Sequence, residues 1–371
     1  MSLAPDTVIG NLPGILPDRD ILALIAEGVI AGTPAPDEAQ VQPASLDLRL
    51  GPKAYRILSS FLPGPTRTVA DKLGDVMTHE IDLTQGMVME KGCVYLVPLI
   101  ERLALPETLA AVANPKSSTG RLDVFTRLIV DRSTAFDRVE AGYQGPLYAE
   151  ISPRSFSIRV RAGDRLNQMR FRRGADLLDD LALSRLNAAE TLVAGPADID
   201  GGIAVSADLT GTGPNGLVGY RAKRHTGLID VTRIGAYDPA AFWEPLHAGA
   251  DKSLILDPNE FYILASKEAV HVPPGYAAEM VPFNPLVGEF RVHYAGFFDP
   301  GFGHAAAGGH GARAVLEVRS HEVPFILEDG QIVGRLVYER LAGRPLSLYG
   351  QGIGSSYQRQ GLALSKHFKR V

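Results

Sequence analysis

The chain has 371 residues, with 45% hydrophobic and 21% charged side chains, a mixture typical of globular proteins with a sizeable buried core. Its formal net charge of -5 argues against a nucleic-acid polymer or an anionic membrane surface as its partner. No apolar run approaches the ~20 residues that cross a membrane. Residues 1–10 lack the basic-then-apolar order of a signal peptide.

Cys93 is the only cysteine, and it lies in an apolar run that predicts a buried strand. We therefore expect no internal disulfide and a reducing cytoplasm. Zinc-dependent nucleobase deaminases bind their metal through a Pro-Cys-x-x-Cys pair and a further His or Cys. One cysteine is too few for that site, so a deaminase built on this chain would activate water without zinc.

Helices are few in the predicted order of elements. The first spans Asp18 to Ile30, and the second spans Ala175 to Ala194, where Gly195 and Pro196 end it. Elsewhere, short apolar stretches alternate with turn residues, which predicts β-sandwich or jelly-roll domains rather than βαβ units. The clearest strands of the first half are 94–99, 110–113, 147–151, 157–160 and 166–171.

The second half of the chain repeats the first. An offset of 167 residues separates Val94 from Phe261 and Pro115 from Pro282, and it recurs at other turn and strand positions. Two copies of so long a unit indicate a duplicated domain and not a solenoid. We therefore predict an all-β protein with a few short helices, made of two related domains at residues 1–195 and 196–371.

Two segments of the first half combine polar side chains with a strand or turn pattern. Residues 42–51 alternate Leu with polar residues, as in a half-buried strand. Residues 115–121, Pro-Lys-Ser-Ser-Thr-Gly-Arg, place hydroxyls, an ammonium and a guanidinium in one turn. Such a turn offers donors and positive charge to a polyphosphate. A solvated turn entering a helix, with Ser117 or Ser118 as its cap, explains the same composition.

Two further segments carry polar groups. Residues 138–150 form a Gly-rich turn and a strand that ends at Glu150. A carboxylate within an apolar strand is costly unless it is paired or functional, although an edge-strand glutamate facing water is the alternative. Residues 349–361 are polar and Gly-rich, which predicts either a lid over a ligand or a disordered terminus.

In this order, the four segments resemble the deoxycytidine triphosphate deaminase family, which shares its fold with the trimeric deoxyuridine triphosphatases. The family has a Gln-Pro-Ser/Ala-Ser-x-Asp-Leu-Arg-Leu-Gly strand and a Ser-Ser-x-x-Arg turn. An Asp-Pro-Gly turn followed by a glutamate comes next, and a tail with Tyr and Gln comes last. The matching segments here are 42–51, 117–121, 140–150 and 349–361. The resemblance implies two β domains of the triphosphatase type.

The resemblance also implies a role for each matched residue. Glu150 is the expected general base and acid, which passes a proton from water to the pyrimidine ring while hydroxide attacks C4. Ser117 is expected to hold that water and the departing ammonia, and Arg121 to supply positive charge. Mg²⁺ is expected to bind through the substrate triphosphate, with no metal ligand in the protein. The expected substrate-binding residues are Lys116, Ser118, Arg138, Tyr357 and Gln360.

Some residues depart from the family pattern. The usual Asp-Pro of the Gly-rich turn is Glu140 and Ala141, and residues 283–288 lack the Ser-Ser-x-x-Arg turn in the second half. The second half does retain Asp299-Pro300-Gly301 and Glu317. We interpret the second domain as structural, with its tail serving the first domain's site and Asp299 as a turn residue.

These observations predict an enzyme that hydrolyses the amino group of dCTP to give dUTP and ammonia. We expect a homo-oligomer, because the family forms its sites between the subunits of a trimer. A dUTP diphosphatase, or a bifunctional enzyme that releases dUMP, is an alternative in which Glu140 or Asp299 would act. A non-catalytic regulator that binds a nucleotide is the third hypothesis.

Overall fold

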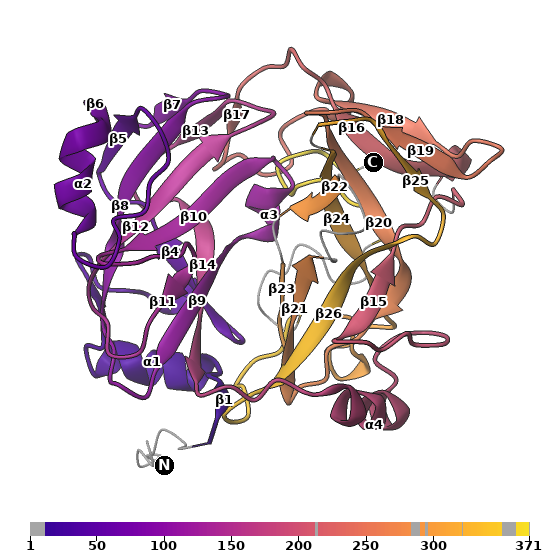
Figure 1. The fold of residues 1–371 in the computed structure, drawn as a ribbon, viewed down its shortest axis with the longest axis horizontal. Helices are drawn as coiled ribbons and strands as arrows, with labels where there is room; N and C mark the ends of the chain where they lie inside the picture. The colour runs from indigo at the N-terminus through magenta and orange to yellow at the C-terminus, as the bar shows by residue number, and fades with distance from the viewer. Residues whose placement is uncertain are drawn as a thin grey trace.

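The structure is a computed structural model that describes residues 12–211, 214–282, 290–293, 296–320, 322–350 and 361–370. Two β domains lie side by side, the first coloured indigo to magenta and the second orange to yellow (Figure 1). The predicted all-β fold with a few short helices is confirmed. None of the described helices is long and apolar enough to pass through a bilayer.

Two six-stranded sheets form the first domain, and their buried side chains share one core. One sheet contains β1 (Gly14–Ile15), β3 (Val41–Gln42), β4 (Ser45–Arg49), β9 (Ala110–Pro115), β11 (Arg138–Val139) and β14 (Arg165–Arg173). The other contains β2 (Ile30–Gly32), β5 (Lys53–Ile57), β6 (Met77–Asp82), β8 (Val94–Ala104), β10 (Val124–Val130) and β12 (Gln144–Pro153).

The second domain repeats this arrangement. Its five-stranded sheet has the order β18-β16-β20-β24-β22, which matches β6-β5-β8-β12-β10 of the first domain. Its strands are β16 (Leu217–Ala222), β18 (Trp243–His247), β20 (Phe261–Val270), β22 (Phe290–His293) and β24 (Ala312–Ser320). The facing sheet contains β15 (Ile203–Ser206), β21 (Tyr276–Pro282), β23 (Phe297–Phe298) and β26 (Ile332–Arg340). β14 begins at Arg165 and β26 at Ile332, so the offset of 167 residues holds in the structure.

Two small sheets complete the fold. β7 (Met87–Met89) and β13 (Ile158–Val160) pair in the first domain, and β17 (Ile229–Asp230) of the second half adds to β13 in parallel. β19 (Ser253–Leu256) pairs with β25 (Phe325–Glu328) in the second domain. The pairing of β17 with β13 is main-chain hydrogen bonding between the two domains, which fixes one domain against the other.

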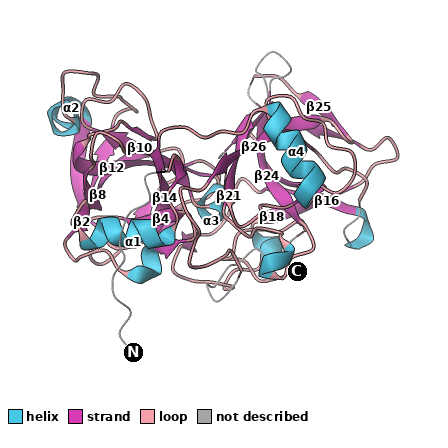
Figure 2. Ribbon diagram, turned by 90° about the horizontal axis from the view of Figure 1, so that it is seen from below, coloured by secondary structure: helices cyan, strands magenta, loops and turns pink. Residues whose placement is uncertain are grey.

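Four α-helices are described, and both predicted helices are shorter than expected. α1 (Asp18–Ala26) ends early because Gly28 takes a positive φ of 74° and Ile30 joins β2. α4 (Asp180–Glu190) begins after the Asp179 cap, and Thr191 ends it in a left-handed conformation. α1 and α4 lie on different domains, while α3 (Ser117–Gly120) lies between them (Figure 2). The remaining helices are α2 (Val69–Val76) and single 3-10 turns at Glu38–Gln40, Pro214–Gly216, Pro239–Ala241 and Ala305–Ala307.

Candidate functional site

The predicted phosphate-binding turn forms α3, which lies at the junction of the two domains (Figure 1). The Lys116 N–H donates to the Leu166 carbonyl of β14 at 2.9 Å, which fixes the start of the turn to the sheet. The Arg121 N–H donates to the Ser117 carbonyl at 3.1 Å and closes it. Ser118 and Arg121 are buried, and Ser117 is half-buried. The turn is therefore a rigid element and not a solvated loop.

The second domain places a carboxylate opposite this turn. Glu317, on β24, lies with its Oε1 3.9 Å from Arg121 Nε, and both side chains are buried. A second ion pair crosses the junction between Asp123 and Arg319. Here the carboxylate belongs to the first domain and the arginine to the second. Burial raises the pKa of Glu317 to about 8, and the charge of Arg121 opposes that rise. Glu317 is thus a buried carboxylate able to exchange a proton near neutral pH.

Asp299 of the second domain also faces the first domain. Arg170, on β14 of the first domain, donates to Asp299 Oδ1 at 3.0 Å and to the Phe298 carbonyl at 2.9 Å. Burial raises the pKa of Asp299, whereas the charges of Arg170 and Lys116 lower it. The interpretation of the second domain as structural did not foresee that both Asp299 and Glu317 face the first domain.

Glu150 has different partners. It lies on β12 opposite Arg127 of β10, and Arg127 Nη2 donates to Glu150 Oε1 at 2.5 Å. The Arg127 guanidinium lies 3.6 Å from the ring centroid of Phe136 and 4.7 Å from that of Phe125. The second carboxylate oxygen of Glu150 is buried without a hydrogen bond within the described chain. Glu150 is therefore engaged by an arginine of its own sheet, and the structure brings Glu317, not Glu150, to Arg121.

The other predicted substrate-binding residues divide into three groups. Lys116 and Ser118 line a cavity next to α3. Arg138 is exposed on β11 and does not line that cavity. Tyr357 and Gln360 lie outside the described residues.

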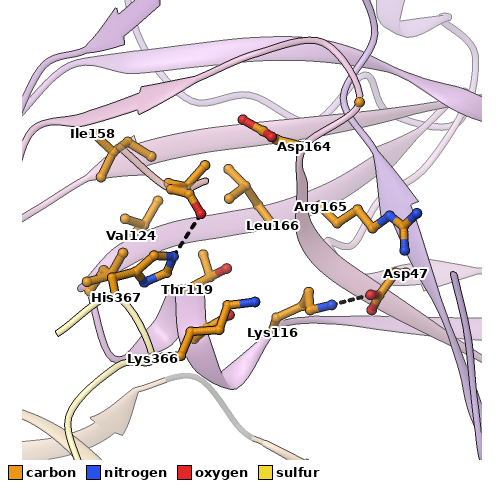
Figure 3. A pocket seen from close by; sticks show the side chains of 14 residues that line it. Asp47, Lys116, Thr119, Val124, Ile158, Asp164, Arg165, Leu166, Lys366 and His367 are labelled. Atoms are coloured by element: carbon orange, nitrogen blue, oxygen red, sulfur yellow. Dashed lines mark hydrogen bonds and ion pairs between the residues drawn. The ribbon is translucent and has the colours of Figure 1, made fainter. Parts of the chain in front are cut away.

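The cavity has a volume of about 290 Å³, and charged, hydroxyl and apolar side chains line it. Lys366 lies close to Lys116, with Arg165 across the cavity (Figure 3). Burial and the charge of Lys116 lower the pKa of Lys366. Asp47 forms an ion pair with Lys116, and its other oxygen is buried and makes no described hydrogen bond. Three cations around one cavity suit a polyphosphate.

One described carboxylate oxygen could contact a metal ion carried by the substrate. No group of three or more His, Cys, Asp or Glu side chains that could hold an ion occurs in the described ranges. The free oxygen of Asp47 fits a hard cation such as Mg²⁺, which needs few protein ligands when phosphates supply the others.

Sequence reasoning missed Arg170, Asp47, Arg165 and the position of Glu317 opposite Arg121. The offset of 167 residues that relates Glu150 to Glu317 was visible in the sequence and marked both as equivalent. Arg170 lies within the strand pattern 166–171 and carries no motif of its own. Only the packing of the two domains shows which glutamate faces the turn.

Comparisons with known proteins agree with this architecture. Residues 12–175 match the family model "2'-deoxycytidine 5'-triphosphate deaminase (DCD) N-terminal domain". Residues 179–368 match the model of the C-terminal domain of the same family. A dCTP deaminase of Halorubrum lacusprofundi is 35% identical over 160 residues, which cover 42% of this chain and 76% of that protein. A "dCTP deaminase, dUMP-forming" of Halobacterium salinarum is 31% identical, over 37% of this chain and 69% of its own length.

A solved structure has the same two-domain extent. The crystal structure of 2'-deoxycytidine 5'-triphosphate deaminase from Agrobacterium tumefaciens is 62% identical, with a TM-score of 0.86. The match covers 89% of this chain and 99% of that chain. Both halves of the sequence match models of one family, and the fold matches a solved structure of that family. The chain therefore belongs to the 2'-deoxycytidine 5'-triphosphate deaminase family.

Proposed function

We propose that this protein hydrolyses dCTP to dUTP and ammonia at one site between its two domains, with Glu317 as the general base. The observation that carries the proposal is the buried Glu317 carboxylate opposite Arg121 of the Ser117–Arg121 turn. A carboxyl group whose pKa lies near neutral pH suits a reaction in which it must first accept a proton and then return it.

The chemistry follows from these groups. Glu317 takes a proton from water, the resulting hydroxide adds to C4 of cytosine, and Glu317 passes the proton to the ring nitrogen N3. The C4–N bond then breaks, and the new C4 hydroxyl proton leaves with the amino group as ammonia. Ser117 holds the water and the departing ammonia, and Arg121 stabilises the charged form of Glu317. Water is the only co-reactant, so the products are dUTP and ammonia.

Lys116, Arg165 and Lys366 are placed to bind the triphosphate, with Ser118 beside them. Asp47 would help hold Mg²⁺ carried by the phosphates, and the ion would supply charge neutralisation. Glu317 and Ser117 need no zinc for the proton transfer. We therefore expect activity to survive a zinc chelator and to fall when Mg²⁺ is removed.

Release of dUMP is the second candidate function. It is favoured by Asp299, whose buried carboxylate lies within the electrostatic reach of Lys116 and Asp47. Some relatives also carry the description "dCTP deaminase, dUMP-forming". In this version Asp299 activates a second water, which attacks the α-phosphate and releases pyrophosphate.

The test is to incubate the purified protein with dCTP and Mg²⁺ and to separate the products by ion-exchange chromatography. We expect dUTP and one equivalent of ammonia. Appearance of dUMP and pyrophosphate in wild type, but not in Asp299→Asn, would establish the bifunctional reaction. Hydrolysis of dUTP without any reaction of dCTP would contradict the deaminase, and binding of dCTP without product would leave a regulator.

Both halves of the proposed site come from one chain, so its activity should not depend on association. The homo-oligomer expected from the family, and the cytoplasmic location expected from the single Cys93, remain predictions. A specific activity that stays constant on dilution, through any change in oligomeric state seen by light scattering, would support a site completed within the chain.

A further inference from the structure

The last described segment, residues 361–370, is attached to both domains. The Tyr237 N–H of the second domain donates to the His367 carbonyl at 3.1 Å, and the Lys369 N–H donates to the Tyr237 carbonyl at 2.8 Å. Phe368 packs 5.9 Å from Trp243, centroid to centroid, in a cluster of aromatic rings. Arg121 of the first domain donates from Nη1 to the Ala363 carbonyl at 3.2 Å. The segment is therefore a fixed part of the junction.

Ser365 connects this segment to the turn that carries Ser117 and Arg121. Its hydroxyl donates to the Ser118 carbonyl at 2.7 Å and lies 2.9 Å from His367 Nδ1. His367 Nε2 lies 3.0 Å from the Val231 carbonyl. Ser365 and His367 are both buried. A continuous chain of hydrogen bonds thus runs from the second domain's Val231 through the two side chains to α3.

The proton positions in this row of hydrogen bonds follow from the acceptors at its two ends. A carbonyl only accepts, so His367 Nε2 must carry the proton that faces Val231. Burial and the neighbouring Lys366 lower the pKa of His367 to about 4, so the ring is neutral at pH 7 and Nδ1 is an acceptor. His367 therefore fixes the rotamer of Ser365, whose single proton is shared between Nδ1 and the Ser118 carbonyl.

α3 depends on this contact because it is a single turn. A four-residue helix has few internal hydrogen bonds and relies on outside partners for its position. The carbonyl that Ser365 binds belongs to Ser118, between Ser117 and Arg121 along the turn. A shift of that carbonyl would move both of these side chains relative to Glu317, and displacements near 1 Å are costly for catalysis.

We propose that Ser365, oriented by His367, is a positioning residue that holds the Ser117–Arg121 turn against Glu317 for the reaction. The inference rests on the proposed deamination. It makes the C-terminal segment a part of the catalytic apparatus of its own chain, acting through α3 and without contact with the reacting atoms.

The test compares Ser365→Ala with a matched control, Ser266→Ala. Ser266, in the second domain, is equally buried and also donates to a carbonyl at 2.7 Å, that of Glu268. It accepts from the Ala314 N–H of β24 at 2.8 Å and makes no described hydrogen bond to α3. Loss of the Ser365 bond should lower kcat about tenfold, the value of one typical hydrogen bond. KM should change less, because the cations that bind the phosphates remain. Ser365→Thr, which keeps the hydroxyl, should recover most of kcat.

Hydrogen exchange at the amides of residues 116–121 is a second measurement that needs no activity. Exchange should be faster in Ser365→Ala and unchanged in Ser266→Ala. Equal kcat and equal exchange for both variants would overturn the positioning role while leaving the deaminase intact. A wild type that does not convert dCTP would overturn the proposed function, and the exchange data would still decide what holds the turn.

Discussion

Glu317 and Glu150 occupy equivalent strands of the two domains, yet their surroundings differ. Glu317 faces Arg121 across the domain junction at 3.9 Å, next to the hydroxyl-bearing turn. Glu150 is bound at 2.5 Å by Arg127, which belongs to the neighbouring strand and stacks on Phe136. An arginine this close forms a charge-assisted hydrogen bond with the carboxylate and compensates its charge. The two glutamates occupy equivalent positions but differ in their arginine partners. The partner of Glu150 lies in its own sheet, whereas the partner of Glu317 comes from the other domain.

The motifs of the two domains are complementary in the same way. The first domain keeps the Lys-Ser-Ser turn at 116–118 and has Glu140-Ala141 where the family has Asp-Pro. The second domain keeps Asp299-Pro300-Gly301 and lacks the serine turn. In each domain, the part that matches the family pattern faces the other domain across the described junction. The full pattern is therefore present only when the two domains are taken together.

The largest predicted effect comes from replacing the arginine partner of each glutamate, Arg121 or Arg127. Arg121→Met removes the charge opposite Glu317 and should lower kcat about a hundredfold, as loss of a preorganised catalytic contact does. Arg127→Met is the matched control beside Glu150. It should lower stability and leave kcat of the folded enzyme within about threefold, because Arg127 lies outside the proposed site. Steady-state kinetics and denaturant unfolding measure the two effects.

Mixing of inactive variants extends this test. Arg121→Met and Glu317→Gln each damage the same site if that site lies within one chain, so a mixture should stay inactive. Recovery of activity on mixing would show that two chains complete one site, and would contradict an intrachain junction.

The next effect concerns stability at the junction. Arg170→Met leaves the buried Asp299 without its arginine, and removal of one partner from a buried ion pair typically costs about 3–5 kcal/mol. The free energy of unfolding in urea should fall by that amount, and Arg170→Met with Asp299→Asn should recover part of it. An unfolding free energy equal to wild type in the single variant would show that Asp299 does not depend on Arg170.

The last effect is a pH dependence to which Glu317 should contribute. Its pKa of about 8 is raised by burial from the ordinary 4.5, so the folded state binds an extra proton between these values. The unfolding free energy should therefore fall as the pH rises from about 5 to about 8. The base form appears over the same range, so kcat/KM should rise with pH until about 8. Glu317→Gln should reduce the slope of the stability profile, whereas Glu150→Gln should keep it. Part of the slope should remain in Glu317→Gln, because burial also raises the pKa of Asp137, to about 7.

Sequence patterns predicted much of this molecule because their signals are local. Alternating apolar residues and turn residues specify strands such as 94–99, and the Lys116–Arg121 segment carries its hydroxyls and cations within one turn. The glutamate that faces this turn is not determined by local sequence. Glu150 lies closer to Ser117 along the chain, but the packing of two domains brings Glu317 to the turn.

The contacts made by Arg170 and Ser365 were equally inaccessible from sequence. Arg170 occupies an ordinary strand position, and its partners are 108 to 129 residues away along the chain. Ser365 is 247 residues from the Ser118 carbonyl that it binds. Neither residue type nor spacing marks such long-range contacts, which arise only when both domains have folded and docked.

The most direct test is to compare the deamination of dCTP by Glu317→Gln and Glu150→Gln at pH 8. Both substitutions keep the size of a buried side chain and remove its charge. We expect kcat about a thousandfold below wild type for Glu317→Gln, since a general base typically contributes a hundredfold to ten-thousandfold. Glu150→Gln should keep nearly full activity. Loss of activity in Glu150→Gln, with Glu317→Gln still active, would contradict the assignment of the base to the second domain.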